Sequence, residues 1–258
     1  MRKQILAVFV LLYVECLSAQ VTIPKTLSSH MVIQRDLPVH VWGTAAPGQV
    51  VSVTFRGESR SGTADPLGHW SIYLKPGAAG GPFSVTVTPG SRSTPESTSE
   101  STTAQPASQP PITLEDIMVG DIWLASGQSN MEFPLSRANT AAQDLPSATN
   151  PQIRLLMIRK RSSDYAMPDA DTDGWTPSTP DTAKDFSAVA WYFARDLAAR
   201  EHVTIGLIDA TWGGTVGEAW VRLTALGEDA SLAPIFVARG KMTDKGADAD
   251  AEEKDEQR

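Results

Sequence analysis

The sequence contains almost no cysteine. Cys16 is the only thiol among 258 residues, and it lies close to the amino terminus. That terminus begins with basic residues at 2 and 3, continues in an apolar stretch over residues 5–13 and reaches Leu17 and the small residues Ser18 and Ala19, as a secretory signal peptide does. We therefore expect a signal peptide over residues 1–19 and an exported protein. Cleavage before Gln20 leaves no disulfide, no thiol nucleophile and no cysteine metal site.

The chain also has little positive charge and no long apolar run. Its formal net charge is -8, with 22 Lys and Arg against 30 Asp and Glu, and the cations form no cluster. A nucleic-acid partner is excluded, because binding phosphates requires clustered cations. The apolar stretch over residues 5–13 is too short to cross a membrane, and Glu15 stands where a lipoprotein signal has a small residue. We expect no membrane partner either.

The first third of the chain shows strand patterns and no helical pattern. Apolar or alternating runs cover residues 39–43, 50–55, 69–74 and 83–87, and Pro or Gly turns separate them. Several short strands at close spacing predict a small β-sandwich domain over residues 20–90. Residues 91–111 are rich in Ser, Thr and Pro and have no apolar period, which predicts a flexible linker or insert.

From residue 112 the pattern is that of an α/β fold. Strands are predicted over residues 117–125, 153–158 and 203–208, and a helix over residues 185–200. Strand, helix and strand in this order predict a parallel sheet over residues 112–237, followed by a charged tail over residues 238–258. The helix has Asp185 as a possible cap. Its predicted apolar face consists of Phe186, Val189, Ala190, Phe193 and Leu197.

The strand over residues 117–125 stops abruptly in a turn of small and polar residues. Gly127 lets the backbone bend sharply, so Ser129 is expected at the carboxyl end of the strand, the edge that holds the chemistry in open α/β sheets. Backbone N–H groups at and near Ser129 can there stabilise an oxyanion, which makes this serine a candidate nucleophile. The alternative is an ordinary strand-to-helix turn in which Ser or Asn only caps a helix.

The longer motif around this turn resembles a known family. Gly127, Gln128, Ser129, Asn130, Met131 and Glu132, preceded by residues 119–123, resemble the first block of the SGNH hydrolases, in the branch of the sialate O-acetylesterases and related carbohydrate acetylesterases. The resemblance implies a flavodoxin-like parallel sheet, a nucleophile at Ser129 and no metal or organic cofactor. Residues 29–43 resemble the opening of the small β-domain that precedes the catalytic domain in this branch. Gln128, Asn130 and Glu132 are candidates for lining the site.

A second glycine turn follows the strand over residues 203–208. Two strand ends of a parallel sheet face the same crevice, so the backbone N–H of Gly213 or Gly214 is a candidate second donor to the oxyanion. Two adjacent glycines are by themselves more often a plain turn. Residues 206–220 resemble a family block that lines the acetylesterase site, which favours the functional interpretation.

The base that would activate the serine is missing from the sequence. His202 is the only histidine of the α/β part, and it is predicted at the amino start of a strand, opposite the site. Asp209 is at the correct edge, but the family does not place its triad aspartate there. The family's Gln-Gly-Glu and Asp-x-x-His blocks do not occur. We therefore expect the amino-terminal part of such an esterase, with an apparently truncated sheet and little activity alone.

Two functional hypotheses follow. The first is an exported serine esterase that removes O-acetyl groups from sialic acid or from plant or microbial glycans. The second is a noncatalytic carbohydrate-binding protein with a degenerate esterase domain. In the second, Trp42, Trp70 and Tyr73 would stack on sugar rings, although aromatic residues in alternating strands more often fill a core.

Overall fold

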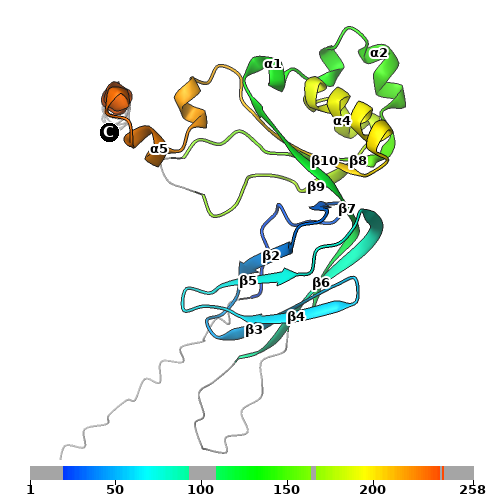
Figure 1. The fold of residues 1–258 in the computed structure, drawn as a ribbon, viewed down its shortest axis with the longest axis vertical. Coiled ribbons are helices and arrows are strands. Elements are labelled where there is room, and N and C mark those ends of the chain that lie inside the picture. The colour runs from blue at the N-terminus through cyan, green and yellow to red at the C-terminus, as the bar shows by residue number, and fades with distance from the viewer. Residues whose placement is uncertain (1–19, 93–108, 164–166, 239, 241–258) are drawn as a thin grey trace, which may run out of the picture.

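The protein is built on one long sheet with a two-stranded ribbon beside it (Figure 1). The computed structural model describes residues 20–92, 109–163, 167–238 and 240. The predicted signal peptide lies outside these ranges, as do most of the predicted linker and of the charged tail. The long sheet has the order β4-β3-β6-β7-β10-β8-β9, with β1 also paired to β7, while β2 pairs with β5. The strands are β1 (Val32–Gln34), β2 (Val39–Thr44), β3 (Gln49–Phe55), β4 (Glu58–Thr63), β5 (His69–Leu74), β6 (Gly80–Arg92), β7 (Ile112–Gly127), β8 (Asn150–Met157), β9 (Trp175–Ser178) and β10 (Ile205–Thr211).

Most of the described helices are a single turn or little more, and residues 233–238 are also helical. The labelled helices are α1 (Ser129–Glu132), α2 (Ala141–Asp144), α3 (Pro180–Ala183), α4 (Ala188–Glu201) and α5 (Leu223–Gly227). Short 3-10 turns add Leu135–Arg137, Leu145–Ser147, Gly217–Trp220 and Ala230–Leu232. Within the described ranges, no helix is both long enough and apolar enough to cross a membrane.

The strands predicted for the first third of the chain pack in two layers around one buried cluster. Inward-facing residues of the β2–β5 ribbon and of β3, β6 and β7 meet there; they include Val41, Trp70, Ile72, Val53, Val87 and Ile117. The alternation of apolar and polar residues produces this arrangement, because successive strand side chains point to opposite faces. The predicted β-sandwich is not confirmed as a separate unit, since β6 pairs with β7 and thereby joins its layer to the α/β sheet.

Strand β7 belongs to both parts of the molecule and is longer than predicted. Its first half pairs antiparallel with β6 and parallel with β1, whose last partner is Gly120. Its second half pairs with β10, from Ile205 opposite Asp121 to Thr211 opposite Gly127, and this pairing is parallel. Strand β8 pairs parallel with the other side of β10, which confirms the predicted parallel sheet. Strand β9 adds an antiparallel edge.

Helix α4 covers one face of this sheet, but its cap and its buried face differ from the prediction. Ser187, not Asp185, is the N-cap, and its side chain accepts the backbone N–H of Ala190. Val189 and Phe193 are 48% and 42% exposed. The buried positions of the helix are Ala188, Ala190, Trp191, Ala194 and Ala198. The predicted Phe186 and Ala190 are therefore buried, and Leu197 is partly buried against the same core. Small alanines let the helix approach the sheet closely, and the Trp191 indole donates to the buried Ser178 hydroxyl at 3.0 Å.

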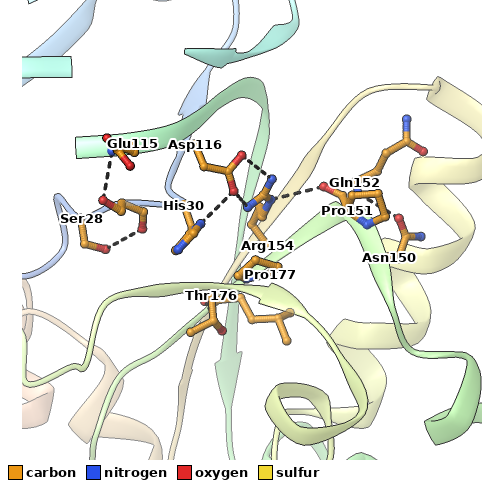
Figure 2. Close-up of polar contacts among 12 residues, drawn as sticks. Ser28, His30, Glu115, Asp116, Asn150, Pro151, Gln152, Arg154, Thr176 and Pro177 are labelled. Carbon is orange, nitrogen blue, oxygen red and sulfur yellow. Dashed lines mark hydrogen bonds and ion pairs between the residues drawn. The ribbon is translucent and has the colours of Figure 1, made fainter. Parts of the chain in front are cut away.

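A polar cluster joins the two parts of the molecule where β7 leaves the β-layer (Figure 2). Asp116 has a left-handed φ of 55° at an irregularity in the β6–β7 pairing. Its carboxylate accepts two hydrogen bonds from Arg154 of β8 and pairs with His30 Nδ1 at 2.8 Å. The Arg154 side chain is only 5% exposed. The hydrogen bonds from Arg154 are the main cause that holds the pKa of Asp116 below its usual range.

Replacing Asp116 tests how much this cluster stabilises the fold. Asp116→Ala leaves the buried Arg154 guanidinium without its carboxylate, and we expect the free energy of unfolding to fall by about 3 kcal/mol. Urea unfolding followed by tryptophan fluorescence measures the change. Asp173→Ala removes one of the two carboxylate partners of an exposed arginine, Arg159, and is the matched control, with little effect expected. Equal effects of the two substitutions would contradict a stabilising role of the buried pair.

Candidate active site

The end of β7 and the turn after it present Ser129 at the carboxyl edge of the sheet. Gly127 has a φ of +136°, a backbone conformation that residues with a side chain rarely adopt. Gln128 is extended, and the chain then enters the single turn of α1 with Ser129 as its first residue. The serine is exposed. The predicted strand end and sharp turn are therefore present.

Ser129 opens onto a cavity of about 690 Å³. The cavity lies between α1 and the residues that follow β8, and its lining mixes apolar, cationic and acidic side chains. These are Ser129, Glu132, Phe133, Pro134, Arg137, Met157, Ile158, Arg159, Lys160, Asp185, Asp209 and Thr211. A cavity with one exposed hydroxyl and several polar groups at the carboxyl edge of a parallel sheet has the usual character of a binding site.

The second glycine turn stands beside the first. The backbone N–H of Trp212 donates to the carbonyl of Gly127 at 2.9 Å, which joins the two strand ends. A methyl group placed on Gly213 would lie 3.4 Å from the Cα and 3.5 Å from the Cβ of Ser129, so Gly213 faces the serine. Gly214 has a φ of +79° and open space around it. The structure thus brings Gly213 next to Ser129, whereas a methyl group on Gly214 would meet no atom within 4 Å.

The Glu132 carboxylate is hydrogen-bonded to the backbone N–H of Gly213, the predicted second donor to the oxyanion. Its Oε2 accepts the Gly213 N–H, while its Oε1 binds Lys160. An incoming oxyanion can use the Gly213 N–H only after this carboxylate withdraws. Sequence reasoning named Glu132 as a lining residue, but the motif gives no signal of its contact with Gly213, because the two residues are 81 positions apart.

The other two predicted lining residues take different places. The Gln128 side chain donates to the carbonyl of Thr215 and so ties the two turns together. Thr215 also accepts the Trp220 indole N–H at 2.8 Å through its hydroxyl, which fixes the end of the second turn. Asn130 is exposed and does not line the cavity.

The histidines lie away from the serine. None of the four lines the cavity. His30 binds Asp116, His40 and His69 lie on the β2–β5 ribbon, and His202 ends α4 before β10 starts. Proton abstraction from Ser129 therefore has no histidine base within this arrangement.

Asp209 is the buried acid of the site. Its carboxylate accepts the Ser187 backbone N–H at 3.1 Å and the Thr211 hydroxyl at 2.7 Å, and it lines the Ser129 cavity. Burial raises the pKa of Asp209 above its usual range, and these hydrogen bonds only partly oppose that effect. The sequence placed Asp209 at this edge but gave no sign of its link to the cap of α4.

Comparison with known proteins finds similarity to acetylesterases. No protein-family model matches it. The chain is 30% identical to the sialate O-acetylesterase of Pongo abelii over 210 residues, which is 75% of this chain and 37% of that protein. It is 28% identical to the rat enzyme over 217 residues, and 29% identical to the human enzyme over 209. The chain thus spans little more than a third of the length of these relatives.

A solved structure agrees with this result. A carbohydrate acetylesterase from Xanthomonas citri superimposes with a TM-score of 0.71 at 34% sequence identity. The match covers 80% of this chain and 43% of that chain. The sequence comparison and the structural comparison therefore both find similarity to acetylesterases.

The pH dependence of stability tests the state of Asp209. Because burial raises its folded-state pKa, the folded protein binds this proton more readily than the unfolded chain, so the free energy of unfolding falls as pH rises from about 3.9 through the raised pKa. In Asp209→Asn this decrease is absent. We therefore expect the stability of the variant minus that of the wild type to increase with pH across this window, measured by urea unfolding.

Asp116→Asn is the control for this experiment, because the pKa of Asp116 is lowered. The stabilisation by Asp116 is present above the unfolded-state pKa and is lost as pH falls below about 3.9. The stability of Asp116→Asn minus that of the wild type therefore decreases with pH, and it does so in a lower pH range than the change for Asp209→Asn. A difference for Asp209→Asn that stays constant with pH would rule out a raised pKa.

Proposed function

We propose that this chain, which is similar in sequence and fold to sialate O-acetylesterases and to a carbohydrate acetylesterase, is part of an exported serine esterase that removes O-acetyl groups from a glycan. The observation that carries the proposal is the exposed Ser129 at the mouth of a cavity, facing Gly213 across two joined turns. The basic and apolar start of the sequence supports export.

In the proposed reaction, the Ser129 hydroxyl attacks the acetyl carbonyl. The Ser129 N–H and the N–H of Gly213 or Gly214 stabilise the oxyanion of the tetrahedral intermediate. The sugar alcohol leaves, and water then releases acetate from the acyl-enzyme. A histidine outside this chain takes the serine proton and returns it to the leaving oxygen.

The contact of Glu132 with Gly213 affects which glycine can donate its N–H to the oxyanion. If Gly213 is the donor, the carboxylate exchanges its N–H for another partner, and Lys160 already holds the second carboxylate oxygen. The Lys160 ammonium also offsets the negative charge that Glu132 places near the developing oxyanion. The ion pair therefore keeps this acid from opposing the reaction.

A noncatalytic carbohydrate-binding protein is the second candidate function. It is favoured by one observation, the absence of all four histidines from the Ser129 cavity. The two candidates differ in the reactivity of Ser129, because a binding protein needs no reactive hydroxyl.

Covalent labelling and chemical rescue separate the two. We expect a fluorophosphonate probe to label Ser129 slowly, and the chain alone to hydrolyse a chromogenic acetate ester at little or no rate. Added imidazole supplies the missing general base, and we expect it to raise hydrolysis above the uncatalysed background by about 10²-fold. Mass spectrometry of the labelled peptide identifies the modified residue.

Two variants control this experiment. Ser129→Ala is expected to lose both labelling and rescue, whereas Ser126→Ala, an exposed serine three residues earlier, retains both. Labelling that persists in Ser129→Ala excludes this serine as the nucleophile. Hydrolysis at ordinary enzyme rates without imidazole would overturn the assignment of the base to a residue outside the chain.

A further inference from the structure

The outer face of the β2–β5 ribbon carries a row of aromatic and hydroxyl side chains, of which Tyr73 is exposed and His40 and Trp42 are half-buried. Alternation along the ribbon turns Val41 and Trp70 into the core and leaves His40, Trp42 and Tyr73 outside. Of the three aromatic residues considered for sugar stacking from the sequence, Trp70 is thus a core residue at 2% exposure, whereas Tyr73 is 54% exposed.

Three rings of this face stack on one another. The His40 ring lies parallel to the Tyr73 ring, with centroids 4.2 Å apart and planes at 4°. Its other neighbour is Trp42, at 4.7 Å and 25°. Burial lowers the pKa of His40, which favours the neutral ring between two aromatic neighbours. The stack holds the Trp42 indole in a fixed orientation.

A cavity of about 480 Å³ opens beside the Trp42 ring. Its walls include Pro24 and Pro168, and hydroxyl groups surround the aromatic ring. The Thr22 and Thr44 hydroxyls are hydrogen-bonded to each other at 2.7 Å, and the Ser71 hydroxyl to His40 Nε2 at 2.8 Å. These residues all line the cavity, apart from Tyr73, which supports the stack from the side.

An apolar groove meets this cavity at His40 and Trp42, which line both. The groove has about 510 Å³ and crosses the sheet face opposite α4, where Ile122 and Leu124 of β7 lie next to Ile208 and Ala210 of β10. Leu124 and Ala210 come shortly before the two turns that form the Ser129 site. The groove thus extends from Trp42 to residues near the carboxyl edge of the sheet.

We propose that the Trp42 cavity and the adjoining groove bind a linear glycan at a position separate from Ser129. An indole face held upright beside hydroxyl groups matches a pyranose, which has apolar C–H faces and an equatorial rim of hydroxyls. A nucleic acid does not fit the net charge of -8. The choice of a glycan over another amphipathic chain rests on the proposed function, whose substrate is an acetylated carbohydrate.

Affinity electrophoresis tests the proposal without requiring hydrolysis. The full chain carrying Ser129→Ala is run in native gels that contain acetylated xylan, xyloglucan or a sialylated mucin. We expect retardation by at least one of them and a dissociation constant about tenfold higher after Trp42→Ala or Tyr73→Leu. Tyr73→Phe, which keeps the ring and loses the hydroxyl, is expected to bind as the parent does.

Phe193→Ala is the matched control, because Phe193 is an aromatic residue of similar exposure on α4, away from the ribbon. It is expected to leave retardation unchanged, and circular dichroism confirms that each variant is folded. Retardation by none of the three glycans overturns the proposal, as does equal retardation of Trp42→Ala and its parent. Glycan binding without fluorophosphonate labelling of Ser129 in the wild type supports the glycan subsite and contradicts the esterase function. Labelling of Ser129 without glycan binding supports the esterase function and contradicts the subsite.

Discussion

The parallel pairing of β7 with β10 is the constraint on which the rest of the site depends. Its register sets Ser126 opposite Ala210 and Gly127 opposite Thr211, so both strands end at the same level. The Trp212 N–H then closes the gap to the Gly127 carbonyl. A register shifted by one residue would reverse the facing of every side chain at this edge and separate Ser129 from Gly213. The candidate chemistry is therefore a consequence of one strand alignment.

Strand β7 also explains why the β-layer and the α/β sheet form one structure. The first half of β7 pairs with β6 and its second half pairs with β10. The β-layer and the Ser129 site are therefore held in position by the same strand. Asp116 of β7 and the buried Arg154 of β8 link the part of β7 that pairs with β6 to the parallel sheet. The ribbon with Trp42 is held over the same sheet by their shared core, which joins the proposed glycan subsite to the sheet that carries Ser129.

The described strands leave one side of the second half of β7 unpaired. Beyond Gly120 no described strand pairs with that side, and Trp123 and Leu124 are 47% and 66% exposed there. Phe193 of α4, which the sequence assigned to the core, packs edge-on against Trp123 with ring centroids 5.0 Å apart and so lies at this rim. An unpaired strand edge flanked by aromatic residues is a site where another strand can add.

Charge at the site is balanced locally. Glu132 is held by Lys160 and the Gly213 N–H, and Asp209 by Thr211 and the backbone of Ser187. The first acid shares the surface with a cation, whereas the second is buried with neutral donors only among its hydrogen-bond partners. This difference in surroundings explains why burial dominates at Asp209.

The sequence by itself determined the features that depend on neighbouring residues. The abrupt end of an apolar run at Gly127, the position of Ser129 after it, the second glycine turn and the parallel order of strands all follow from local backbone freedom and periodicity. Only the tertiary structure decided the cap of α4 and its buried face, because Ser187 and Trp191 are selected by contacts with Asp209 and Ser178. The same holds for the Glu132 contact with Gly213 and the His40 stack, since contacts between distant or facing strands leave no periodic signal in the chain.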